Sequence, residues 1–121
     1  MKTLKIAVIT LVAIAAASAS CDSSKRSRGT EFVIAESKSV EASIFRQNCA
    51  VCHGAEGNGK EVSGVMVPSL RYGKAAKTSE EEIYNQIKNG KMPMPAFKNQ
   101  LSEEDIVKMV RFVMRDLQGR Q

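Results

Sequence analysis

The pentad Cys49-Ala50-Val51-Cys52-His53 holds two cysteines three positions apart, followed at once by the only histidine of this 121-residue chain. This order of side chains is typical of covalent attachment of a c-type haem. On a helix the two thiols would project to the same side, so both could form thioethers to one porphyrin edge, with the imidazole beneath the iron. The pentad therefore predicts one haem c, bound through Cys49 and Cys52.

Two other uses of the cysteine pair fit the rest of the chain less well. A tetrahedral zinc site needs a second Cys/His pair, which the chain does not contain. A redox-active dithiol of the thioredoxin kind follows a strand, whereas the residues before Cys49 have a helical pattern. Haem attachment remains the prediction.

The composition fits one small domain built around a bulky cofactor. A chain of 121 residues with no tryptophan and 5% aromatic residues has few bulky side chains for a core, and a porphyrin would supply the missing packing. The formal charge of +5 is mild, and acidic runs at 80–82 and 103–105 interrupt the basic residues. We therefore expect no nucleic-acid partner.

Residues 1–20 have the order of charge, apolar run and small residues that is typical of a secretory signal peptide. Ala17-Ser18-Ala19 fits ordinary cleavage, whereas Ser18-Ala19-Ser20-Cys21 resembles a bacterial lipoprotein site, with Ser18 where an aliphatic residue is usual. The lipoprotein route accounts for the third cysteine, because Cys21 would carry the lipid. We expect a periplasmic protein anchored to a membrane through Cys21; a freely soluble periplasmic protein is the alternative.

Residues 21–39 are rich in serine and charge and predict a flexible tether. Its one apolar run, at 32–34, allows a short extended segment that lies on the domain.

Residues 40–121 predict one all-α domain with three main helices, over 40–49, 79–90 and 102–119. Each helix follows a serine that can cap its first turn, and its apolar residues recur at helical spacing. The residues that mark these apolar faces are Val40, Ile44, Phe45, Ile83, Tyr84, Ile87, Ile106, Val110, Val113 and Leu117. Glycine-rich residues 54–67 predict a loop, and the prolines between 90 and 97 display two methionines from another.

Several motifs follow the order and spacing of class I cytochromes c, in particular the short bacterial and photosynthetic type. They are Asn48–Gly54, Gly57, Gly59, Pro68–Leu70, Asn89–Gly90, Met94–Phe97 and Leu101–Glu104. The chain resembles this family over residues 40–118. The resemblance implies a small cytochrome c fold whose three helices wrap around one covalent haem c, with Phe45 and Phe112 joining the first and last helices.

By this resemblance His53 is the proximal ligand of the iron and Met94 is the distal ligand. Met92, two residues earlier, is the alternative distal ligand. An imidazole and a thioether together hold iron six-coordinate and favour the ferrous state.

The resemblance also assigns residues around the cofactor. The Pro68 carbonyl would accept a hydrogen bond from the second ring nitrogen of His53, while Leu70 and Phe97 would pack on the macrocycle. Candidates to meet the haem propionates, or else exposed loop residues, are Arg71, Tyr72 and Lys74.

The function expected from these features is single-electron transfer between redox protein partners through the Fe(II)/Fe(III) couple. With both axial positions filled, the iron is poorly suited to binding oxygen, peroxide or nitrite, so we expect no enzyme activity. The main alternative is the haem c subunit of a larger periplasmic oxidoreductase. A small haem peroxidase and a gas sensor are less favoured, because the methionine loop would close the open position that they need.

Overall fold

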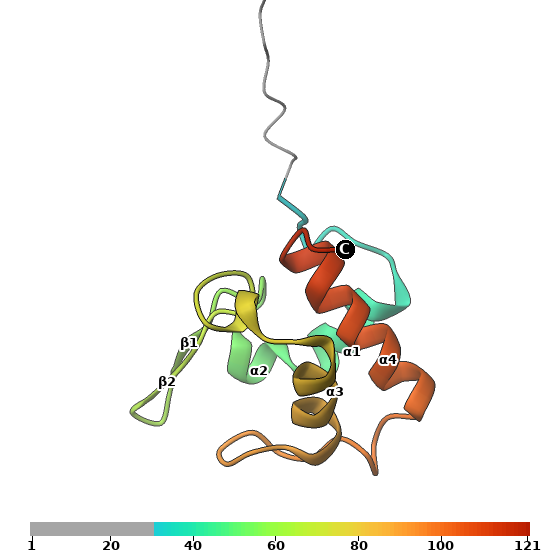
Figure 1. The fold of residues 1–121 in the computed structure, drawn as a ribbon. Helices are drawn as coiled ribbons and strands as arrows, with labels where there is room; N and C mark the ends of the chain where they lie inside the picture. The colour runs from blue at the N-terminus through green and yellow to red at the C-terminus, as the bar shows by residue number, and fades with distance from the viewer. Residues whose placement is uncertain (1–30) are drawn as a thin grey trace, which may run out of the picture.

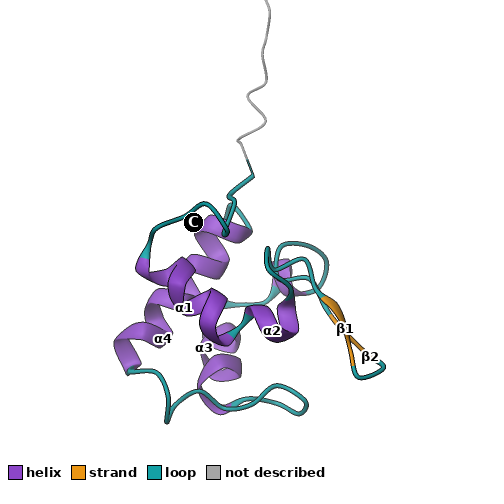
Figure 2. Cartoon of the chain, turned by 180° about the vertical axis from the view of Figure 1, so that it is seen from behind, coloured by secondary structure: helices purple, strands orange, loops and turns teal. Residues whose placement is uncertain are grey.

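The computed structural model describes residues 31–121, so the predicted signal peptide, Cys21 and the first part of the predicted tether lie outside the described residues. The helices are α1 (Val40–Asn48), α2 (Ala50–His53), α3 (Glu80–Asn89) and α4 (Glu103–Arg111), which continues as the π-helix η2 (Phe112–Leu117). A hairpin of β1 (Lys60–Val62) and β2 (Val65–Val67) and a short 3-10 helix (Ala75–Lys77) lie between α2 and α3 (Figures 1 and 2). The predicted mostly helical fold with three main helices is confirmed. No helix within residues 31–121 is both long enough and apolar enough to span a lipid bilayer.

The three main helices begin where the sequence predicts. At each start a serine hydroxyl accepts a hydrogen bond from the backbone N–H three residues further on, at 3.1–3.2 Å. The serines are Ser39, Ser79 and Ser102. In α3 the Glu82 carboxylate also accepts from the Ser79 backbone N–H at 2.9 Å, which completes the predicted capping box.

The hairpin differs from the prediction, which gave residues 54–67 no regular structure. Lys60 pairs with Val67 and Val62 with Val65 in antiparallel register. The turn has positive φ at both Ser63 (50°) and Gly64 (79°), the combination that a two-residue hairpin turn requires. The prediction of a plain loop is therefore wrong over 60–67. Two strands of three residues each are too short to show an alternating pattern in the sequence.

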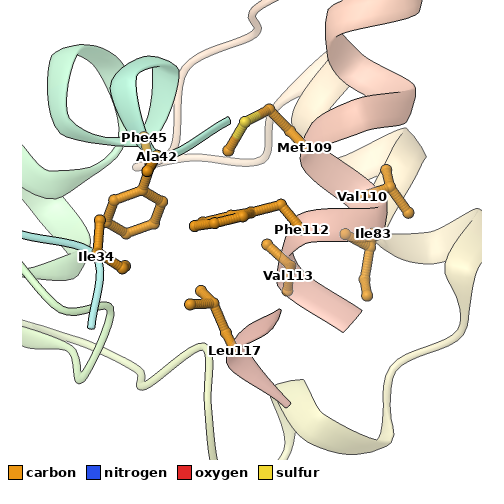
Figure 3. Packing of buried hydrophobic residues seen from close by; sticks show 9 residues of the cluster. All are labelled: Ile34, Ala42, Phe45, Ile83, Met109, Val110, Phe112, Val113 and Leu117. Carbon is orange, nitrogen blue, oxygen red and sulfur yellow. The ribbon is translucent and has the colours of Figure 1, made fainter. Parts of the chain in front are cut away.

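The core lies between α1 and the C-terminal helix. The Phe45 and Phe112 rings lie 6.0 Å apart between centroids at an angle of 48°, so the predicted contact between the first and last helices is confirmed (Figure 3). Buried apolar residues surround this pair. They are Ile34, Ala42, Ile83, Met109, Val110, Val113 and Leu117.

A segment before α1, residues 31–37, lies packed against this core, and we name it the strap. Ile34 is fully buried, and the Phe32 ring meets Phe112 edge-on, with centroids 5.5 Å apart. The structure therefore differs from the predicted flexible tether, residues 21–39, over its described part. Burial of these two apolar side chains offsets the entropy of ordering the strap, whereas the serine-rich and charged composition around them favoured a disordered interpretation.

We expect Ile34→Ala to lower the free energy of unfolding by about 3 kcal/mol, because it removes a fully buried side chain and leaves a cavity. The measurement is chemical denaturation of the haem-loaded protein. Val33→Ala is the matched control, since Val33 is 42% exposed and should cost less than about 0.5 kcal/mol. Equal and small losses for the two variants would show that the strap is not part of the core in solution.

Candidate haem site

The pentad lies at the junction of α1 and α2. The Cys49 N–H donates to the Phe45 carbonyl at 2.8 Å, and the Cys49 carbonyl accepts from the N–H groups of Cys52 (3.1 Å) and His53 (2.9 Å). The chain thus keeps a helical course through the pentad, which places the two cysteines one turn apart. Both thiols are free and half-buried, as attachment to one cofactor edge requires.

The environment of Cys49 disfavours its thiolate. Burial, and after it the charge of Cys52, raises the pKa of the Cys49 thiol to about 11. Redox dithiols and zinc-binding cysteines depend instead on a lowered thiol pKa. Within residues 31–121, no group of three or more His, Cys, Asp or Glu side chains is placed to hold a metal ion.

His53 has one ring nitrogen in an unusual position. Its Nδ1 is buried and makes no hydrogen bond of normal geometry with any described residue. Burial lowers the pKa of His53, and the nearby backbone of Pro68 raises it by a smaller amount. Burial thus disfavours the charged imidazolium, and the predicted acceptor, the Pro68 carbonyl, lies close to the ring but outside normal hydrogen-bond geometry. A buried polar atom left in this way fits a haem ligand, whose second nitrogen needs one fixed partner.

Pro68 is brought to His53 by a close approach of two backbone segments. The Gly59 N–H donates to the His53 carbonyl at 2.8 Å. An added Cβ at Gly59 would lie 2.5 Å from the Val67 oxygen and 2.8 Å from the Pro68 carbonyl carbon. Gly59 also has φ +79°, a conformation that favours glycine. Only glycine therefore lets the segment after β2 lie against the end of α2.

Leu70 continues this contact. Its N–H donates to the Gly57 carbonyl at 2.9 Å, and its half-buried side chain packs against the core. The Gln118 side-chain amide donates to the Leu70 carbonyl at 2.7 Å from the C-terminal end of the chain. Leu70 is therefore held from both sides, as a residue that covers a cofactor should be.

The loop after α3 presents the two methionines. Lys91 and Met94 exchange backbone hydrogen bonds at 3.0 and 2.9 Å, which closes a tight turn with Met92 at its tip. The loop then returns along α3, where the Phe97 N–H donates to the Ile87 carbonyl at 3.1 Å. In both ribbon views this tip lies on the side of the molecule that carries α2 (Figures 1 and 2). The structure thus displays the methionines from a loop, as predicted.

The two methionines differ in burial and contacts. Met92 is 90% exposed, whereas Met94 is half-buried and its Sδ accepts a hydrogen bond from the Gln86 side-chain amide at 3.3 Å. Sequence reasoning gave Gln86 no role, because a polar residue on a helix usually faces water. Gln86 lies four residues before Gly90, near the end of the helix that leads into the methionine loop. That position is the signal from which its contact with Met94 could have been predicted.

The remaining predicted residues lie as follows. Phe97 is 6% exposed, so its ring is already buried by the described chain. Arg71 is not available to bind haem propionates, because its buried guanidinium forms ion pairs with Glu31 and Glu56. The Tyr72 hydroxyl donates to Glu31 at 2.9 Å.

A family model described as cytochrome C oxidase, cbb3-type, subunit III, matches residues 40–113, which is well over half of the chain. The chain belongs to this family of mono-haem class I c-type cytochromes. The match contains the pentad, Pro68, Leu70 and Met94. A c-type cytochrome of this family carries a covalent haem, and the Cys49/Cys52 pair is consistent with that attachment.

Individual relatives point to one kind of c-type cytochrome. Cytochrome c6 of Gracilaria tenuistipitata var. liui is 39% identical over 71 residues, which cover 59% of this chain and 65% of that protein. Cytochrome c6 of Euglena gracilis is 37% identical over 82 residues, 64% of this chain and 91% of that protein. The crystal structure of cytochrome c6C from Synechococcus sp. PCC 7002 is 32% identical with a TM-score of 0.53, covering 67% of this chain and 98% of that one.

These similarities confirm the small cytochrome c fold. They support a cytochrome c6-like electron carrier with redox protein partners, rather than an enzyme, and a location outside the cytoplasm.

The close approach at Gly59 gives a direct test of this geometry. We expect Gly59→Ala to lower the free energy of unfolding of the haem-loaded protein by about 3 kcal/mol or more, because the new methyl group would overlap backbone atoms of Val67 and Pro68. Gly64→Ala is the control: Gly64 has the same φ of +79° but no atom within 4 Å of the added Cβ, so it should cost only about 1 kcal/mol. Equal losses in denaturant titrations would mean that the backbone approach does not exist in solution.

Proposed function

We propose that this protein is an exported cytochrome that carries single electrons between two redox protein partners, through one haem c whose iron is held by His53 and Met94. When bound, the haem supplies the Fe(II)/Fe(III) couple. The observation that carries the proposal is the half-buried His53 at the end of α2, whose buried Nδ1 has no hydrogen-bond partner among the described residues, together with the half-buried Met94 on the loop after α3.

Met94 is the better candidate for the distal ligand. Its backbone is held in a turn by two hydrogen bonds with Lys91, and its sulfur accepts a hydrogen bond from the Gln86 side-chain amide. Met92 stands at the exposed tip and would have to displace this turn to reach the interior. A thioether opposite an imidazole favours the ferrous state and leaves no position for a substrate.

The other site residues exclude water and fix orientation. Leu70 and Ile87 are half-buried apolar side chains from the segment after β2 and from α3, and Phe97 is buried behind the methionine turn. The Pro68 carbonyl would provide the backbone acceptor for the second nitrogen of His53 when haem is bound. Together they would surround the cofactor with apolar groups, and the low dielectric lowers the reorganisation that accompanies electron transfer.

The cellular placement belongs to the same proposal. Residues 1–20 direct export, and Cys21 carries a lipid that holds the cytochrome at a membrane surface in the periplasm. This part is supported by the order of residues before Cys21 and by a family whose location is outside the cytoplasm.

A second candidate is the haem c subunit of a larger oxidoreductase. The description of the matching family model favours it, because that description names a subunit of an oxidase. Gentle solubilisation of membranes that contain the protein separates the two candidates: a free carrier runs as a small protein, and a subunit runs with a larger complex.

The ligand assignment predicts opposite spectra for two variants. We expect Met94→Ala to abolish the methionine-to-ferric charge-transfer band of the oxidised protein, because the thioether that gives rise to it is lost. Met92→Ala is the matched control and should keep the band, since Met92 is 90% exposed. The measurement is the absorbance spectrum of the exported, oxidised protein. Loss of the band in Met92→Ala with retention in Met94→Ala would reverse the assignment.

A further inference from the structure

Arg71 is the one charged side chain that is buried among residues 31–121, with 3% of its surface exposed. A guanidinium removed from water is costly unless its donors and its charge are matched. Here they are matched by two carbonyls and two carboxylates. Arg71 donates hydrogen bonds to the Glu56 carbonyl, to the Phe32 carbonyl (2.7 Å) and to the Glu56 carboxylate (3.3 Å), and its Nη1 forms an ion pair with the Glu31 carboxylate (3.3 Å).

Glu56 binds the strap in addition to binding Arg71. Its two carboxylate oxygens accept hydrogen bonds from the backbone N–H groups of Ile34 (2.7 Å) and Ala35 (3.0 Å). Three segments therefore meet at one ion pair: the strap, the loop that follows the pentad, and the segment that follows β2. We call this arrangement the Arg71 clamp.

The Arg71 clamp joins the same two segments whose contact brings Pro68 to His53: the loop after the pentad and the segment after β2. Glu56 is three residues after His53, and Arg71 is three residues after Pro68. Next to this ion pair the two segments touch through the bond from the Leu70 N–H to the Gly57 carbonyl, and further along through Gly59, which lies against Val67–Ser69. The Arg71 clamp closes the other end, so neither segment can swing away from the other while the guanidinium keeps its bonds.

We propose that Arg71 is a positioning residue for the haem ligand His53: it locks the 68–71 segment against the loop after the pentad and so keeps the Pro68 carbonyl within reach of the His53 Nδ1–H. The inference rests on the proposed role of His53 as an iron ligand. It adds the residue that fixes the second nitrogen of that ligand.

The geometry requires an arginine rather than a general positive charge. The Arg71 guanidinium uses separate nitrogens for its two carbonyl acceptors: Nε donates to the Glu56 carbonyl, and Nη2 donates to the Phe32 carbonyl of the strap. A lysine ammonium keeps the charge but cannot span these acceptors with a planar fork. Arg71→Lys therefore preserves the net charge near the haem and removes the clamp.

The test is hydrogen exchange in the ferrous, haem-loaded protein, followed by proton NMR. We expect the His53 Nδ1 proton to exchange with solvent about tenfold faster in Arg71→Lys, because its acceptor is no longer held. The amide of Val110, buried in α4, should exchange at the wild-type rate. Arg46→Lys is the matched control: Arg46 binds the same strap, through the Ile34 (2.7 Å) and Ser37 (3.0 Å) carbonyls, but within the described residues it makes no hydrogen bond to the 68–71 segment.

The outcomes separate the inference from a merely structural role. An unchanged Nδ1 exchange rate in Arg71→Lys would overturn it, and so would a rise of the same factor at the Val110 amide, which reports global stability. A similar increase in Arg46→Lys would assign the effect to the strap and would also overturn it. If Arg71→Lys yields no haem-loaded protein, Glu56→Gln takes its place with the same expected increase, because its amide nitrogen would face a backbone donor of the strap.

The proposed function is checked on the wild-type protein first. Absence of covalent haem from the wild type would overturn the proposed function and the inference with it. A wild type with haem and a methionine charge-transfer band, together with an unchanged rate in Arg71→Lys, would overturn the inference alone.

Discussion

Two contacts between backbone segments, each possible only at a glycine, hold the two sides of the proposed haem site. At Gly59 the backbone of Val67–Ser69 lies so close that an added Cβ would be 2.5–2.8 Å from its atoms. At Gly90 the backbone of Met94–Ala96 approaches equally closely, at 2.6–2.7 Å. The first contact sets the environment of His53, and the second folds the methionine loop back onto α3. Both glycines have positive φ, so no other residue type could serve at either place without strain.

Much of the fold and of the site could be predicted because the signals are local. The helix starts follow from Ser39, Ser79 and Ser102, and the attachment site follows from one pentad. The features that the sequence did not reveal depend on contacts between distant residues. The partners of Arg71 lie 15 and 39 residues away along the chain, and no pattern in the sequence connects them. The strap was indicated only by its apolar run at 32–34, because the surrounding stretch is charged and serine-rich and its contacts with the core are distant in the sequence.

The strap extends the packed domain toward the N-terminal region of the chain. The family match begins at residue 40, but the packed structure begins earlier, with Phe32 and Ile34 in contact with the core. Glu56 and Arg71, which bind the strap, also flank the contact around His53. The strap is thus attached next to the loop that follows the pentad. It contacts the same two segments that bring Pro68 close to His53.

The central claim is that both axial positions of the iron are filled by the chain, so that the protein transfers electrons without binding a substrate. Addition of carbon monoxide to the ferrous protein at neutral pH tests it most directly, because the gas binds only where an axial position is open. A closed site predicts an absorbance spectrum that does not change. Rapid and stoichiometric uptake of carbon monoxide would contradict the claim.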